Sequence, residues 1–131
     1  MNLEAKIENK GSYILATISG DFDLNKSLEL FIEILKAASD KKLSKILIDF
    51  RRMSSRPSYL DELTYATKTA KFWRDFMRSS KSKNPKLAYV ADQILDADRS
   101  GVLAAENRGA FNFEVFQDIK KAEDWLNTDD Y

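Results

Sequence analysis

Apolar and polar residues alternate in two short runs near the beginning of the chain, Leu3–Ile7 and Tyr13–Ser19. A period of two is typical of a strand that buries one face. The polar residues Asn9–Ser12 separate the two runs and include Gly11, and glycine adopts the positive φ of a tight turn without strain. The pattern therefore predicts an N-terminal β-hairpin.

The pattern changes to a helical period after Gly20–Asp23. Apolar residues then recur at intervals of three or four: Leu24, Leu28, Phe31, Leu35 and Ala38. This spacing places their side chains on one face of a helix. Asp23 directly precedes the run and is a residue type that accepts hydrogen bonds from first-turn amides. We expect a helix that begins at Leu24 and buries one face.

Two compact apolar runs, Ser44–Phe50 and Leu87–Ala91, are typical of central strands that are covered on both faces. Between them lies the polar segment Arg51–Ser58, called the 51–58 segment below. It is followed by a helical pattern from about Tyr59 to about Ser80, and Pro85 terminates that helix. The middle of the chain therefore predicts strand, helix and strand.

The last third of the chain continues this alternation. Three further elements are expected: a helix over 96–107 closed by Gly109, a strand over 112–116, and a helix over 119–126 capped by Asp118. The order ββαβαβαβα predicts an α/β fold, with a mixed sheet of about five strands and about four helices. The centre of the sheet is expected to be parallel, with the hairpin at one side. We expect a single domain over 1–127 and an acidic tail at 128–131.

Composition removes most catalytic machinery. The chain of 131 residues contains no cysteine and no histidine. A Ser-His-Asp or Cys-His nucleophile, a Cys/His zinc site, a haem His or Cys ligand and a Cys-ligated iron–sulfur cluster are therefore excluded. Its four glycines are isolated from one another, so neither a dinucleotide-binding fingerprint nor a P-loop is present. We expect no enzyme activity, no metal and no cofactor.

Charge is distributed unevenly along the chain. Residues 41–86 carry 13 Lys/Arg and 4 Asp/Glu, a net charge of +9, and the flanks carry 8 and 17, a net charge of −9. Balanced blocks of this kind are typical of charges that pair within one folded body, so nucleic-acid binding is not expected. No apolar run approaches the roughly 20 residues of a membrane-spanning helix, which predicts a cytoplasmic protein.

The element order is combined with three motifs: I-L-I-D-F at 46–50, E-N-R-G at 106–109 and F-Q-D-I-K-K-A-E-D-W-L at 116–126. Together they resemble the STAS-like family, and more narrowly stand-alone proteins that are described as SpoIIAA-like, after the anti-sigma-factor antagonists of that fold. The resemblance implies a STAS-like fold and a regulatory role. In such antagonists a partner kinase phosphorylates a serine at the start of the helix that follows the central strand. Ser58 falls at about that position, although the family's Asp-Ser-Ser-Gly or Asp-Ser-Thr-Gly signature is absent.

The 51–58 segment is the first candidate site. Ser58, with Asp61 and Glu62 after it, fits a helix N-cap. Alternatively, a serine in this segment takes a phosphate or contacts an anion, assisted by three arginines and the helix N-terminus. The candidates are Ser54, Ser55, Ser58, Arg51, Arg52 and Arg56. Arginines in a surface loop are more often solvated or paired with nearby acids, and the acidic flanks of the chain supply such partners.

The helix after this segment carries more apolar surface than one face needs. The stripe expected to face the sheet contains Leu63, Ala66, Ala70, Trp73 and Met77. Three aromatic residues, Tyr65, Phe72 and Phe76, lie to one side of it. They are either covered by a neighbouring helix or by Phe111–Phe113, or they form a partner groove, a dimer interface or a lipid-binding cavity.

Two weaker candidates follow later in the chain. Asp92, Asp96 and Asp98 lie after a buried strand, where they fit either a helix cap or a metal or acid/base site. Arg108 lies at the end of a predicted helix, where it is either a cation that interacts with the helix dipole or part of a pocket rim. The candidate residues for a ligand or an interface are therefore Tyr65, Phe72, Phe76, Trp73 and Arg108.

These observations favour a non-enzymatic STAS-like regulatory module. It is expected to recognise a protein partner or an anionic ligand through the 51–58 segment and the helix that follows, or to form a homodimer. The alternative is a carrier of a small hydrophobic or amphipathic ligand, which the aromatic residues beside a basic helix edge would accommodate.

Overall fold

The structure, a computed structural model, describes residues 1–80, 84–92 and 113–128. Within these ranges the elements are β1 (Glu4–Asn9), β2 (Ile14–Gly20), α1 (Leu24–Asp40), β3 (Lys45–Met53), α2 (Tyr59–Ser79), β4 (Lys86–Val90), β5 (Phe113–Phe116) and α5 (Ile119–Leu126). Their order confirms the predicted α/β alternation. The helix expected over 96–107 lies outside the described residues.

The strands form one mixed sheet in the order β1-β2-β3-β4-β5. β1 is antiparallel to β2, and every later neighbour pair is parallel. The hairpin between β1 and β2 turns at Gly11, whose φ is +93°, and the Lys10 N–H donates to the Tyr13 carbonyl oxygen at 2.9 Å. The predicted hairpin and parallel centre are both confirmed.

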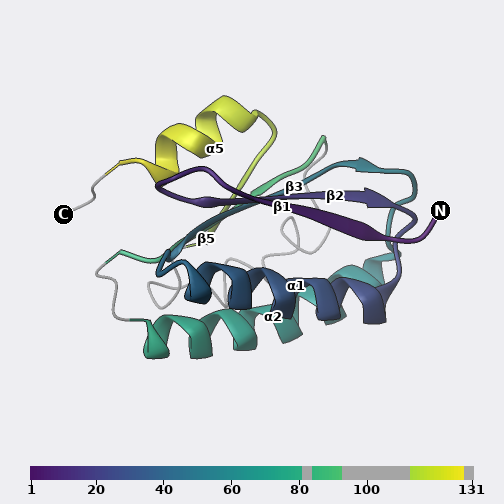
Figure 1. Cartoon of the computed structure of the whole chain (residues 1–131). Helices are drawn as coiled ribbons and strands as arrows, with labels where there is room; N and C mark the ends of the chain where they lie inside the picture. The colour runs from purple at the N-terminus through teal and green to yellow at the C-terminus, as the bar shows by residue number, and fades with distance from the viewer. Residues whose placement is uncertain (81–83, 93–112, 129–131) are drawn as a thin grey trace.

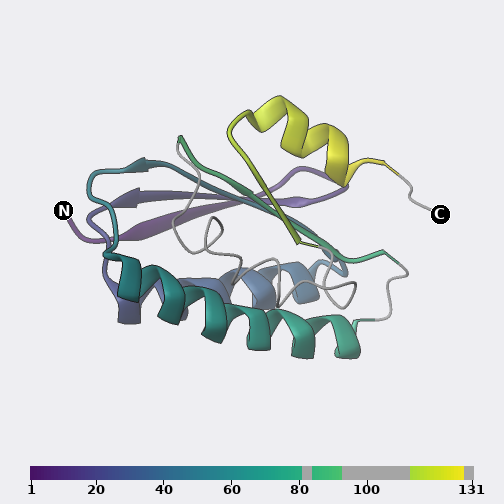
Figure 2. The same ribbon diagram turned by 180° about the vertical axis from the view of Figure 1, so that it is seen from behind.

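Helices cover both faces of the sheet. Figure 1 shows α1 and α2 side by side on one face and α5 on the other, and Figure 2 shows the same layers from behind. Successive side chains of the central strand β3 point to opposite faces, so Ile46 and Ile48 pack with α1 and Leu47 packs with α5. Burial on both faces explains why this strand is apolar without alternation.

The structure corrects two details of the sequence prediction. β3 continues to Met53, so Arg51 and Arg52 belong to a strand and the loop begins at Ser54. The strand is longer because β2 extends to Gly20, which pairs with Met53. On α1, the buried face contains Ser27, Leu30, Phe31, Ile34, Leu35 and Ala38, whereas the predicted Leu24 and Leu28 are partly exposed.

Candidate functional site

The 51–58 segment comprises the last three residues of β3 and the loop that leads to α2. In parallel sheets the C-terminal edge of the strands is where ligand sites commonly form. Ser58 is the N-cap of α2, and its Oγ accepts a hydrogen bond from the Asp61 N–H at 3.1 Å. Asp61 and Glu62 lie in the first turn, where carboxylates interact favourably with the helix dipole. The interpretation of Ser58 as a cap is confirmed.

The other two serines connect this segment to the β2–α1 turn. The Ser54 hydroxyl donates to Asp21 Oδ1 at 2.8 Å, and the Ser55 Oγ accepts from the Phe22 N–H at 2.9 Å. The hydrogen bond from Ser54 is the main reason that the pKa of the Asp21 carboxyl is lowered. Both serines are exposed and nevertheless hold the loop in place.

The Arg51 side chain forms hydrogen bonds with another residue of its own strand. Its Nε and Nη2 donate to the two carboxylate oxygens of Asp49, each at 2.9 Å. Asp49 is 5% exposed and lies on the α5 face of β3. The hydrogen bonds that Arg51 donates to the Asp49 carboxylate raise the pKa of the Arg51 guanidinium. The first arginine of the segment therefore neutralises a buried carboxylate.

Arg56 is also paired with a buried acid. Its Nη2 lies 3.7 Å from Oε1 of Glu62, whose side chain is 3% exposed. Arg52 is exposed, and no ion pair with it is found among the described residues. All three candidate arginines thus lie at one end of the sheet. Two of them, Arg51 and Arg56, form ion pairs with buried carboxylates of the same chain.

Two large apolar side chains that directly follow this segment in the sequence are exposed. Tyr59 is 47% and Leu60 is 70% exposed, and both lie in the first turn of α2. The sequence pattern does not single out either residue as part of the candidate site. The helical period does indicate that Leu60 is exposed, because at 100° per residue its position is about a third of a turn away from that of the buried Ala66.

The aromatic residues of α2 are covered largely by α1 and the sheet. Phe31 of α1 lies 6.4 Å from Tyr65 and 6.5 Å from Phe72, measured between ring centroids. Phe76 stacks on the buried Trp73 at 5.3 Å. This arrangement matches the expectation that a neighbouring helix covers them, and it leaves them half-buried.

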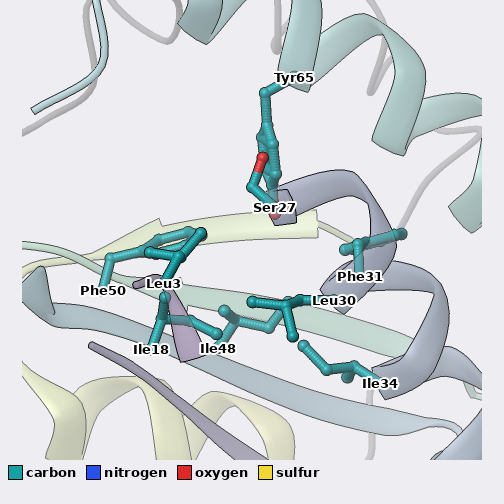
Figure 3. A pocket seen from close by; sticks show the side chains of 9 residues that line it. All are labelled: Leu3, Ile18, Ser27, Leu30, Phe31, Ile34, Ile48, Phe50 and Tyr65. Carbon is teal, nitrogen blue, oxygen red and sulfur yellow. The ribbon is translucent and has the colours of Figure 1, made fainter. Parts of the chain in front are cut away.

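The Tyr65 hydroxyl lies in the interior. It is 3.3 Å from the hydroxyl of Tyr89, and burial raises the pKa of both phenols. The side chain also borders a cavity between the sheet and α1, shown in Figure 3. The cavity has about 10 Å³ of free volume, close to that of one water molecule, and an acyl chain needs far more.

Several predicted residues fall outside the described ranges. These are Asp96, Asp98, Arg108 and the Phe111–Asn112 part of the segment expected to cover α2. Within the described part of the chain, no group of three or more acidic side chains is placed to hold a metal ion. No helix in this part is long and apolar enough to cross a membrane.

Comparison with solved structures identifies the fold. An anti-sigma factor antagonist from Mycobacterium paratuberculosis superposes with a TM-score of 0.61 at 12% identity, covering 97% of this chain and 96% of that protein. An uncharacterised protein with a SpoIIAA-like fold from Shewanella loihica gives a TM-score of 0.53 at 19% identity, covering 95% and 93%. No protein-family profile matches the chain, and no curated protein is significantly similar in sequence. The chain has a SpoIIAA-like, STAS-like fold.

Proposed function

We propose that this chain is a non-enzymatic regulatory module that binds a protein partner through the 51–58 segment and the first turn of α2. The observation that carries the proposal is the exposure of Tyr59 and Leu60 beside this segment. Large apolar side chains that remain in solvent at the rim of a rigid element are typical of a recognition surface. The fold that the chain shares with an anti-sigma factor antagonist supports a regulatory role.

A protein partner fits this surface better than a free anion does. Arg51 and Arg56 are each paired with a buried carboxylate, so their charge is already compensated. An anion would therefore compete with Asp49 and Glu62 for the same guanidinium groups. An apolar contact at Leu60 does not require either of these ion pairs to break.

Phosphorylation is the regulation that this surface accommodates. A phosphate on Ser58 would lie at the N-terminus of α2, where negative charge is favourable. A phosphate on Ser54 would lie against the Asp21 carboxylate, which is unfavourable. We therefore place a regulatory phosphate on Ser58 rather than on Ser54.

Site-specific photo-crosslinking in the cells that make this protein tests the proposal. One variant carries a photo-crosslinking amino acid in place of Leu60, and a matched control carries it in place of Ile32, which is 49% exposed on α1. We expect a discrete protein adduct from position 60 and none from position 32. The adduct should disappear when Tyr59→Ser is added.

The same adduct pattern from both positions, or none from position 60, would overturn the proposal. If the cavity beside Tyr65 were the binding site of the alternative function, a carrier of a small hydrophobic ligand, α2 would have to move away from α1, because this cavity has a volume of about 10 Å³. Native mass spectrometry of the same purified protein distinguishes the two functions, since a carrier retains a small molecule that denaturation releases.

A further inference from the structure

β1 is an end strand of the described sheet, and half of its backbone groups face away from β2. The Lys10 N–H donates to Tyr13, and Glu8 lies opposite Leu15 in the same ladder. In an antiparallel pair, residues whose backbone groups hydrogen-bond to the neighbouring strand alternate with residues whose backbone groups point away from it. The even-numbered residues of β1 therefore bond to β2, and the amides and carbonyls of Ala5, Ile7 and Asn9 point outward.

Neither a proline nor a bulge interrupts β1. The strand has six residues, contains no proline, and pairs with β2 in continuous register from Glu4 to Asn9. Figure 1 shows β1 in front of the rest of the sheet. Edge strands that stay open in this way are templates for a further strand.

The charges along β1 alternate in sign on one face of the sheet. Ala5 packs against the core beneath α1, so its even-numbered neighbours lie on the opposite face. These neighbours are Glu4, Lys6 and Glu8, followed by Lys10 beyond the end of the strand. Lys6 and Lys10 lie 3.9 and 3.4 Å from the carboxylate of Glu8. A strand with this alternation is complementary to a second copy of itself.

We propose that two copies of this chain associate through antiparallel pairing of their β1 strands, centred on Ile7. A two-fold axis at Ile7 brings the outward backbone N–H and C=O groups of Ala5 opposite those of Asn9 in the second copy. It also brings Ile7 opposite Ile7 of the second copy. Lys6 then lies opposite Glu8, and Glu4 lies opposite Lys10. These charged pairs occupy the non-hydrogen-bonded positions, where side chains of neighbouring strands approach most closely.

The neighbouring symmetric registers are disfavoured by the same charges. Centring the pairing on Lys6 places Lys6 opposite itself and Glu4 opposite Glu8. Centring it on Glu8 places Glu8 opposite itself and Lys6 opposite Lys10. Like charges directly opposite each other destabilise strand pairing. The pairing centred on Ile7 is the longest symmetric register in which every opposed charged pair is of unlike sign.

Ile7 adds an apolar contact at the centre of this interface. It is 37% exposed, and in the paired arrangement it meets its own copy on the face that carries α1. An interface of one strand from each copy is small, so the dimer is expected to be weak and to dissociate on dilution. The interface uses β1 and leaves the 51–58 segment free for another partner.

Sedimentation velocity of the full chain over a micromolar to millimolar concentration series tests the proposal. The wild-type chain should shift reversibly from monomer to dimer. K6E and E8K should each raise the dissociation constant about tenfold or more, because each turns two unlike pairs into like pairs. An equimolar mixture of K6E and E8K should form a heterodimer, since every altered pair is then of unlike sign. K36E, the same charge change on the exposed face of α1, should leave dimerisation unchanged.

Ile7→Pro provides a second test that does not depend on charge. Its N–H points outward, so proline removes hydrogen bonds of the dimer and keeps the ladder to β2. We expect a monomer with an unchanged circular dichroism spectrum. A wild-type chain that stays monomeric throughout the series would overturn the proposal. So would a dimer that K6E and Ile7→Pro leave intact, or a mixture of K6E and E8K that does not associate.

Discussion

Arg51 binds the buried carboxylate of Asp49 through two parallel hydrogen bonds, each of 2.9 Å, from neighbouring positions on one face of β3. The Arg51 backbone N–H donates a third bond to the same carboxylate at 3.0 Å. An ionised carboxylate is tolerated in the interior when it is paired and hydrogen-bonded in this way. The arginine that looked free for a ligand is therefore part of the sheet.

Removal of Arg51 should destabilise the fold. R51A leaves the Asp49 carboxylate buried without its guanidinium partner, and we expect the free energy of unfolding to fall by about 2 kcal/mol. R52A, which alters an exposed neighbour, should change it by less than about 0.5 kcal/mol. Urea denaturation of the two variants measures the difference. Equal effects would show that the Asp49 carboxylate does not depend on Arg51.

Negative charge should be tolerated at Ser58 and not at Ser54. S58D retains an N-cap acceptor and places charge at the favourable end of α2, so its urea midpoint should match the wild type. S54D removes the donor to Asp21 and places two carboxylates together, so its midpoint should fall. S55D serves as a control for charge elsewhere in the segment. A midpoint for S58D lower than that of S54D would contradict the assignment of Ser58 as the regulated position.

Most of the fold was predictable because its signals are local. The sequence predicts Asp23, Ser58 and Asp118 as helix caps, and each accepts a hydrogen bond from an amide two or three residues later. The period of two in β2 and the apolar run of β3 fixed which strand lies at the centre. These features depend on neighbours in sequence, so the sequence alone contains them.

The partners within the candidate site were harder to predict. Arg56 pairs with Glu62 across a helix cap, and Ser54 meets Asp21 from another part of the chain. Such contacts depend on how β2, β3 and α2 are placed in space. The exposure of Tyr59 depends on tertiary placement in the same way. Tyr59 lies two turns before Ala66, on the face where the stripe predicts burial, and its 47% exposure shows that burial of this face does not extend to Tyr59.

Stability should decrease at high pH through Tyr13. The Tyr13 hydroxyl donates to Glu123 of α5 at 2.6 Å, and burial together with this carboxylate raises the pKa of the phenol to about 12. An unfolded tyrosine ionises near pH 10. The stabilisation is therefore complete below about pH 10 and is lost as the pH rises towards 12.

The comparison of the wild-type chain with Y13F isolates this contribution. Y13F lacks the ionisable group and should be less stable at neutral pH, because Glu123 loses its donor. The stability difference between the two proteins should narrow between pH 10 and 12 in chemical denaturation experiments. A difference that stays constant over this range would mean that Tyr13 ionises alike in the folded and unfolded chains.

Lys86 should hold the C-terminal end of α5 against the sheet. Its ammonium group is buried and donates to the carbonyl oxygens of Trp125 and Thr128, each at 2.7 Å. It also lies 4.9 Å from the centroid of the Trp125 ring. The end of a helix carries partial negative charge, so a cation at this position is stabilising.

Replacement of this lysine by methionine keeps the apolar length of the side chain and removes the charge. K86M should lower the free energy of unfolding by about 2 kcal/mol, since two charge-assisted hydrogen bonds to the backbone are lost. Hydrogen exchange should accelerate most at the amides of α5, with β3 less affected, because the bonds anchor that helix specifically. K121M, an exposed lysine of the same helix, is the matched control and should leave exchange in α5 unchanged. Exchange that accelerates equally in α5 and β3 would indicate that Lys86 supports the whole fold rather than the end of α5.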